Sequence, residues 1–130
     1  QIPILGVCLG HQVIGHVFGA TVRKGRQPMH GKITPVHHQD TGLFSGLPAT
    51  FDVTRYHSLV VAPEDLPSCL IANAWSADGS VMGMVHRTMP IYGVQFHPEA
   101  VLTQFGRELL RNFYKICERW ERPYASYAGI

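Results

Sequence analysis

Apolar residues in this chain form several short runs and, near the C-terminus, one long helical stripe. Residues 2–7 are mostly apolar and partly β-branched, and they end at a turn of small residues, which predicts a short buried strand. After this turn, Val13, Ile14 and Val17 fall at helical spacing, and Gly19 follows where a helix commonly ends. The chain is therefore expected to open with a strand, a tight turn and a helix.

The middle of the chain has the pattern of short β-strands. The runs predicted as strands are residues 32–37, 51–56, 70–75, 81–86 and 91–96. The turn signals "DTG" and "SGLP" between the first two indicate an irregular or antiparallel β segment. Asp78 and Gly79 within "SADGS" predict a hairpin between residues 70–75 and 81–86. Pro90 breaks the chain before the last run, which resembles another buried strand.

The C-terminal stripe predicts an amphipathic helix. Its apolar positions are Phe105, Leu109, Phe113, Ile116, Cys117 and Trp120, and charged residues such as Glu108 and Arg111 oppose them. We expect Pro123 to end this helix, because proline lacks the N–H that continues the ladder. Residues 1–118 are accordingly predicted to form the domain, and residues 119–130 a tail or the start of a linker.

Composition limits the class of protein. With 130 residues, 45% of them hydrophobic and 15% charged, the chain fits one globular domain. No apolar run approaches the ~18 residues of a membrane span, three cysteines do not make a disulfide framework, and a net charge of +2 gives no continuous basic face. A cytoplasmic protein that binds neither membrane nor nucleic acid is expected.

The beginning of the chain is unusual for a complete domain. It starts with "QIP", without an initiator methionine, and passes directly into the first apolar run. We therefore expect a C-terminal portion that begins inside a domain.

The turn after the first strand carries the clearest chemical pattern. Gly6-Val7-Cys8-Leu9-Gly10 has the form G-x-C-x-G between a strand and a helix, which is the layout of a nucleophile elbow with cysteine in place of serine. The helix N-terminus would favour the thiolate and lower its pKa. The Leu9 backbone N–H would face a developing oxyanion. The alternative is a cysteine that merely packs the end of a strand.

His97 and Glu99 are the best candidates to assist this cysteine. His97 follows an apolar run, and reactive groups gather at the carboxyl ends of parallel strands, where Cys8 is also expected. Pro98 biases His97 toward extended geometry, so residues 97 and 99 project to the same side. The pattern predicts a Cys-His-Glu triad, with His97 as base and acid and Glu99 as its orienting partner. An ordinary histidine on a surface loop is the alternative.

A metal site is a third possibility, but the spacing disfavours it. No cysteine lies near another, and His11 and His16 are five residues apart, away from a common helix face. No metal ligand is predicted.

Four motifs, "GVCLGHQ", "MHGK", "RYHSLV" and "GVQFHPE", occur here in the order found in class I, triad-type glutamine amidotransferases. The chain resembles the glutaminase component of anthranilate synthase and aminodeoxychorismate synthase over roughly residues 3–115. The resemblance implies an α/β, flavodoxin-like fold: an open mixed, mainly parallel sheet with flanking helices, of which the N-terminal part is missing.

The resemblance also implies the chemistry and the substrate contacts. Cys8 would attack the side-chain amide of glutamine, and ammonia would pass to a chorismate-using synthase, either a separate subunit or a fused domain. Gln12 would contact the bound glutamine, and Ser58 and Leu59 would meet its α-carboxylate and α-amino end, largely through backbone groups. No cofactor is expected in this domain, whereas the synthase partner would use Mg²⁺.

Three further implications concern residues around the site. His11 would support the elbow and not act as the base, because it lacks an orienting partner such as Glu99. The loop of residues 29–32 resembles the family's loop facing the synthase partner, although a solvated turn is equally consistent with its residues. "TRYHSLVV" and the following "AWS" slightly favour the aminodeoxychorismate branch over the anthranilate branch.

Two departures from the family pattern stand out. Ala100 follows Glu99 where the family usually has serine, so a hydrogen bond from that side chain is lost. The larger departure is at the front, because the family's upstream strands and the glycine-rich loop that supplies a second oxyanion donor are not in this sequence.

The isolated 130-residue chain is therefore expected to be inactive or poorly folded, even if the full-length protein is an active glutaminase. Loss of one oxyanion donor costs on the order of 3 kcal/mol, about a hundredfold or more in rate. Glutamate release by the isolated chain measures this, and turnover comparable to an intact amidotransferase would contradict it.

Overall fold

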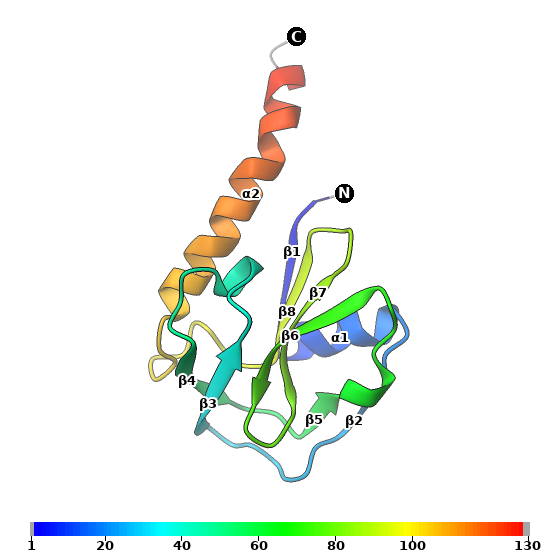
Figure 1. Cartoon of the computed structure of the whole chain (residues 1–130), viewed down its shortest axis with the longest axis vertical. Coiled ribbons are helices and arrows are strands. Elements are labelled where there is room, and N and C mark those ends of the chain that lie inside the picture. The colour runs from blue at the N-terminus through cyan, green and yellow to red at the C-terminus, as the bar shows by residue number, and fades with distance from the viewer. Residues whose placement is uncertain (1, 129–130) are drawn as a thin grey trace.

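The computed structural model describes residues 2–128, and the side chains of residues 2–120. A six-stranded sheet with the strand order β1-β8-β7-β6-β3-β4 forms its centre (Figure 1). The strands of this sheet are β1 (Ile4–Val7), β3 (Lys32–His38), β4 (Thr50–Arg55), β6 (Leu70–Ser76), β7 (Val81–His86) and β8 (Ile91–Val94). A second, two-stranded antiparallel sheet pairs β2 (Val22–Lys24) with β5 (Leu59–Val61).

The sheet is mixed, as predicted, but its parallel part is smaller than expected. Within the described residues, β1 and β8 form the parallel pair, with Val7 opposite Val94. Every other pairing of the six-stranded sheet is antiparallel, and short turns connect β6 to β7 and β7 to β8 without a helical crossover. The expected hairpin between β6 and β7 is confirmed.

Two helices cover opposite faces of the sheet. Helix α1 (Leu9–Val17) packs Ile14 over a cluster that includes Val61 and Met84. Helix α2 (Gly106–Ala128) packs Leu109 into a separate cluster on the other face. Short 3₁₀ turns at Gly42–Phe44 (η1) and Pro63–Asp65 (η2) complete the order of elements.

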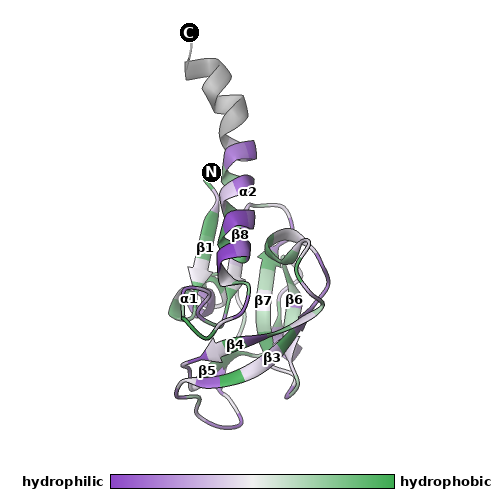
Figure 2. Cartoon of the chain, turned by 90° about the vertical axis from the view of Figure 1, so that its left-hand side faces the viewer, coloured by the Kyte–Doolittle hydropathy of each residue, from purple (hydrophilic) through white to green (hydrophobic). Residues whose placement is uncertain are grey.

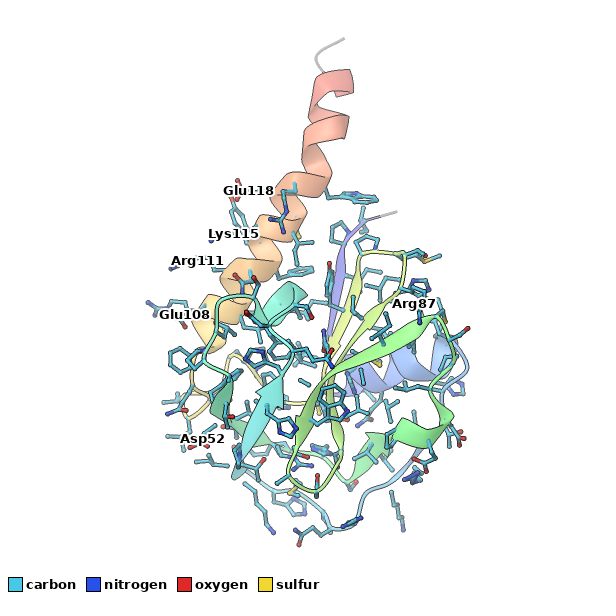
Figure 3. All side chains as sticks on the ribbon, in the orientation of Figure 1. Asp52, Arg87, Glu108, Arg111, Lys115 and Glu118 are labelled. Atoms are coloured by element: carbon cyan, nitrogen blue, oxygen red, sulfur yellow. The ribbon has the colours of Figure 1, made fainter. Side chains whose placement is uncertain are left out.

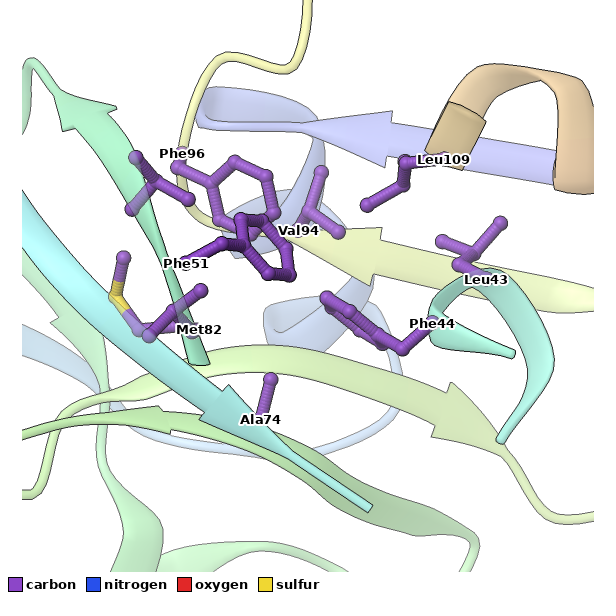
Figure 4. Close-up of a cluster of buried hydrophobic side chains, with 10 residues drawn as sticks. Leu43, Phe44, Phe51, Ala74, Met82, Val94, Phe96 and Leu109 are labelled. Carbon is purple, nitrogen blue, oxygen red and sulfur yellow. The ribbon is translucent and has the colours of Figure 1, made fainter. Parts of the chain in front are cut away.

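The cluster under α2 is the main hydrophobic core. Phe44, Phe51 and Phe96 lie in mutual contact there, with ring centroids 6.4 Å apart in each pair (Figure 4). These three rings are almost completely buried, and burial of such side chains stabilises a fold by roughly 1.5–3 kcal/mol each. The core therefore anchors the strand segment that ends just before His97.

Helix α2 is amphipathic, as predicted. Leu109 is fully buried, whereas the charged side chains along the outer side of the helix project away from the sheet (Figure 3). Those labelled side chains are Glu108, Arg111, Lys115 and Glu118. The hydropathy colouring shows the same polar side on α2 (Figure 2). Asn112 Nδ2 ties the helix to η1 by donating to the carbonyls of Leu43 (2.8 Å) and Ser45 (2.9 Å).

Both ends of α2 differ from the sequence prediction. Phe105 precedes the helix and has a φ of 56°, because the chain turns sharply there to enter α2. The helix also does not end at Pro123 but continues to Ala128. Proline removes one backbone hydrogen bond at a cost of about 3 kcal/mol, which disfavours a helix without forbidding it. Residues 129–130 of the predicted tail lie outside the described part.

Within residues 2–128, no helix has both the length and the apolar character needed to cross a membrane.

Candidate active site

The predicted elbow is present at the end of β1. Cys8 is the N-cap of α1, with φ 53° and ψ −100°, a strained conformation that a non-glycine residue adopts only when its surroundings enforce it. A Cβ on Gly6 would lie 2.6 Å from the backbone of Gly10, so only glycine allows the strand to approach the helix this closely. At Gly10 itself the described residues leave the Cβ position open.

Cys8 lies between β8 and the segment after β4. Its backbone N–H donates to the Val94 carbonyl at 2.9 Å, which extends the pairing of β1 with β8. Its thiol faces the Tyr56 carbonyl oxygen at 3.7 Å. The Gln95 side-chain amide donates to the sulfur, also at 3.7 Å. The sulfur is therefore flanked by one acceptor and one donor.

The pKa of the Cys8 thiol is raised above its ordinary value, contrary to the sequence prediction. Partial burial is the largest cause, because it removes water from the thiolate. The Leu9 backbone N–H and the Gln95 amide oppose this rise, and the negative charge of Glu99 adds to it. The helix N-terminus acts in the predicted direction, through the Leu9 N–H, but it does not outweigh desolvation.

His97 and Glu99 form the predicted pair. His97 Nδ1 lies 2.9 Å from Glu99 Oε2, which places the ring proton on Nδ1 and leaves Nε2 as the basic nitrogen. The Tyr56 ring packs edge-on against the His97 ring with centroids 5.6 Å apart. Because the carbonyl of Tyr56 also faces the Cys8 thiol, this residue brings the two predicted catalytic side chains to the same place.

The backbone of His97 is fixed from several sides. Its N–H donates to the Thr54 carbonyl at 3.3 Å, and its carbonyl accepts from Thr103 Oγ1 at 2.7 Å. The loop that follows returns so closely that a Cβ on Gly106 would lie 1.8 Å from the Pro98 oxygen. Strand β4, the loop at Thr103 and the start of α2 therefore hold His97 in position together.

The residues implied to contact glutamine also lie around Cys8. Gln12 Nε2 donates to the Leu59 carbonyl at 3.1 Å and to Gln95 Oε1 at 3.3 Å. Leu9, Ser58 and Leu59 are exposed. The Ser58 carbonyl is occupied by the Gly25 N–H at 2.9 Å. Leu9 follows Cys8 in the chain, and Gln12 and Leu59 are linked to the Cys8 sulfur through Gln95, whereas the hydrogen bond of Ser58 leads to Gly25 instead.

Three polar residues of this region were missed by the sequence analysis. Gln95 contacts the sulfur, and Arg55 and His57 are buried beside Leu59. A signal for Gln95 existed, since it is the polar residue in an otherwise apolar run before His97. Arg55 and His57 gave none, because an arginine and a histidine at a strand end are usually exposed.

His11 is fully buried in α1 against Gly93, and it lies close enough to His57 for that residue to act on its charge. Desolvation lowers its pKa to about 4, so it stays neutral at neutral pH. His16, on the same helix, is exposed. In the part of the chain whose side chains are described, no three His, Cys, Asp or Glu residues are arranged to hold a metal ion.

The loop of residues 29–32 is attached to the site by its backbone. Met29 is buried, and its N–H donates to the His57 carbonyl at 2.9 Å. The Gly31 N–H donates to the Arg55 carbonyl at 2.9 Å. The loop is therefore more than a solvated turn, because it braces the segment that leads from β4 to β5.

Most of the chain is similar to proteins of one known family. Residues 1–117 match the family described as "Glutamine amidotransferase class-I". The chain belongs to this family. Of the solved structures, one assigned to GMP synthase from Thermoplasma acidophilum superposes on 95% of the chain with a TM-score of 0.88 and 40% identity, and the match covers 61% of that structure.

Similar amidotransferases are components of chorismate-using synthases. The chain is 59% identical to anthranilate synthase component 2 of Pseudomonas putida, over 88% of this chain and 61% of that protein. It is 50% identical to aminodeoxychorismate synthase component 2 of Escherichia coli, over 87% of this chain and 60% of that protein. The amidotransferase chain described here thus spans less than two thirds of the length of these relatives.

Replacement of Gly6 tests the packing of the elbow. We expect Gly6→Ala to lower the free energy of unfolding by about 1–3 kcal/mol or more, because the new methyl group overlaps the backbone of α1. Gly10→Ala is the matched control and should be neutral or stabilising, since alanine suits a helix and the space is open. Denaturant unfolding of the full-length protein measures both, and equal losses in the two variants would contradict the steric argument.

Proposed function

We propose that the protein hydrolyses glutamine through a cysteinyl thioester and supplies the ammonia to a synthase that aminates chorismate. The observation that carries this proposal is the convergence of a strained cysteine elbow with the His97–Glu99 pair around Tyr56. Membership of the class I amidotransferases supports glutamine as the substrate, and the component 2 relatives support a synthase partner.

Each residue has a defined role in the proposed reaction. His97 takes the thiol proton, and the Cys8 sulfur attacks the amide carbon of glutamine. The Leu9 N–H stabilises the oxyanion of the tetrahedral intermediate. His97 then returns the proton to the leaving nitrogen, ammonia departs, and a glutamyl thioester remains. Water, deprotonated by His97, hydrolyses the thioester to glutamate, while Glu99 keeps the imidazole in the required tautomer.

The proposed substrate contacts follow the family motifs. Gln12 uses both amide hydrogens within the protein, so its Oε1 is left to accept a hydrogen bond from the bound glutamine. Ser58 and Leu59 would meet the α-amino acid end of the substrate. The domain would need no metal or cofactor of its own, whereas the synthase would use Mg²⁺.

The identity of the synthase stays a prediction. The sequence slightly favours aminodeoxychorismate synthase, which serves folate formation, over anthranilate synthase, which serves tryptophan formation. Relatives with both names match the chain, so they support a partner of this kind without favouring either synthase. We also propose that the protein is cytoplasmic and that the isolated chain is inactive.

The domain boundary is likewise proposed. Residues 1–118 would form the C-terminal portion of the amidotransferase domain, which fits the partial coverage of the relatives. The edge strand β1 and the adjoining face of α1 leave Ile4, Val13 and Val17 exposed, as a surface packed by further chain of the same domain would. An inactive binding module of the same fold is the alternative, as is the amidotransferase of another synthase such as carbamoyl-phosphate synthase.

Covalent labelling separates the enzyme from the inactive module. In the full-length protein, the glutamine-analogue electrophile diazo-oxo-norleucine should label Cys8 stoichiometrically and abolish glutamate release. Cys8→Ala should lose both labelling and at least about a hundredfold of activity, since the reaction then lacks its nucleophile. Cys69→Ala is the control and should behave like the wild type. Labelling that persists in Cys8→Ala would show that Cys8 is not the nucleophile.

The pH profile tests His97 as the base. Glutaminase activity should fall on the acid side, because a protonated His97 cannot accept the thiol proton. His97→Asn should lose at least about a hundredfold in kcat, together with the ascending limb of the profile. Rates measured between about pH 5 and 9 decide this, and an unchanged ascending limb in His97→Asn would assign the base elsewhere.

A further inference from the structure

A line of hydrogen bonds runs beneath Cys8 through two buried glutamine side chains. Gln12 donates to the Leu59 carbonyl and to Gln95 Oε1, and Gln95 Nε2 donates to the Cys8 sulfur at 3.7 Å. Gln95 is completely buried, and Gln12 is 7% exposed. Burial of two primary amides is costly unless their polar atoms are paired. The presence of two such amides next to the sulfur therefore needs a structural or functional explanation.

The orientation of both amides follows from one backbone oxygen. The Leu59 carbonyl can only accept, so the NH₂ group of Gln12 must face it. The same NH₂ group faces Gln95, which must therefore present its oxygen there. The NH₂ group of Gln95 is consequently turned toward Cys8, and the contact with the sulfur can only be a donation.

A buried arginine and histidine fix the Leu59 carbonyl from the other side. Arg55 Nε, which can only donate, lies 3.0 Å from His57 Nε2. The proton of the neutral imidazole is therefore on Nδ1, which donates to the Leu59 carbonyl at 3.0 Å. Burial and the charge of Arg55 lower the pKa of His57 to about 4, so this tautomer persists at neutral pH.

Asp78, in the turn between β6 and β7, holds Arg55 in place. Its carboxylate lies 3.6 Å from Arg55 Nη2. Partial burial opposes its ionisation, but hydrogen bonds from Ser76 and Ser80 and the charge of Arg55 outweigh that effect and lower its pKa to about 2. The carboxylate is thus charged at any pH at which the protein works, and the buried guanidinium keeps a counter-ion.

A donor at the sulfur favours the thiolate. Burial and the negative charge of Glu99 both raise the pKa of Cys8, while the Leu9 N–H and the Gln95 amide lower it. Within the described residues, Gln95 is the only side chain that donates to the sulfur. Its hydrogen bond strengthens when the sulfur becomes charged, as hydrogen bonds to ions do.

We propose that Gln95 is a catalytic residue that stabilises the Cys8 thiolate, held in its donating orientation by Gln12, the Leu59 carbonyl and the Arg55–His57 pair. This inference rests on the proposed role of Cys8 as the nucleophile. Arg55 and His57 touch neither the sulfur nor the site of the substrate amide in this scheme, so they are positioning residues.

Alkylation of Cys8 in the full-length protein tests the inference without any glutamine turnover. The rate of modification by iodoacetamide, followed by mass spectrometry of the Cys8 peptide across pH, reports the pKa of the thiol. Gln95→Met, which has a similar shape and no donor, should move the midpoint upward by about one pH unit. Gln95→Asn, whose shorter amide does not reach the sulfur, should move it in the same direction.

Matched variants separate this effect from a general loss of packing. Gln104→Met removes a hydrogen bond to the Asp52 N–H, away from the sulfur, and should leave the midpoint unchanged. Arg55→Met should raise the alkylation midpoint by less than Gln95→Met does. Loss of Arg55 leaves the Gln95 amide in place and only allows His57 to change its tautomer. Arg87→Met, which removes an exposed arginine bonded to the Ser68 carbonyl, should not change the midpoint.

Glutamine kinetics give the second readout. Below the alkylation midpoint, Gln95→Met should lower kcat about tenfold, in proportion to the loss of thiolate, with a smaller change in KM. An unchanged midpoint in either folded Gln95 variant would overturn the inference and leave Gln95 as a packing residue. A wild-type protein that releases no glutamate would overturn the proposed function instead, while the alkylation midpoint would still report on Gln95.

Discussion

The parallel pairing of β1 with β8 is the constraint on which the candidate site depends. It sets Val7 opposite Val94, so both strands end at the same edge of the sheet. Cys8 follows the first strand immediately, and Gln95 and His97 follow the second. A one-residue shift in this register would turn the side chains of one strand to the opposite face. The Cys8 sulfur would then be separated from both Gln95 and His97. The surrounding core of aromatic rings holds that register by packing directly beneath the end of β8.

Electrostatics at the sulfur explain why several groups are needed. Burial raises the pKa of the Cys8 thiol, which lowers the fraction of thiolate. The Leu9 N–H and the Gln95 amide, which are both uncharged, lower the pKa and so offset part of the effect of burial. Glu99 acts in the opposite sense on the sulfur, yet it orients His97. Any contribution of this carboxylate to the proposed reaction must therefore come through the imidazole, whose Nδ1 it contacts.

The sequence allowed the main elements and the positions of Cys8, His97 and Glu99 in them to be predicted because their signals are local. Cys8 sits between glycines at the end of an apolar run, and His97 and Glu99 flank a proline at the end of another. The hairpin at Asp78 and the amphipathic α2 were recognisable for the same reason. The direction of the Cys8 pKa was predicted wrongly, since the helix N-terminus is visible in the sequence whereas the degree of burial is a property of the folded chain. The persistence of α2 beyond Pro123 shows likewise that a local breaker is a preference and not a prohibition.

Arg55, His57 and Gln95 were not predicted because their roles arise from contacts between residues far apart in the chain. Arg55 is buried only because Asp78, on a different hairpin, provides a counter-charge beside it. Removal of that carboxylate would leave a buried guanidinium unpaired, at a cost that commonly reaches several kcal/mol. The turn between β6 and β7 is thus linked to the Leu59 carbonyl, and through it to the two glutamine amides. A hairpin turn that contacts Arg55, and not the sulfur itself, thereby helps to decide which end of Gln95 faces the Cys8 sulfur.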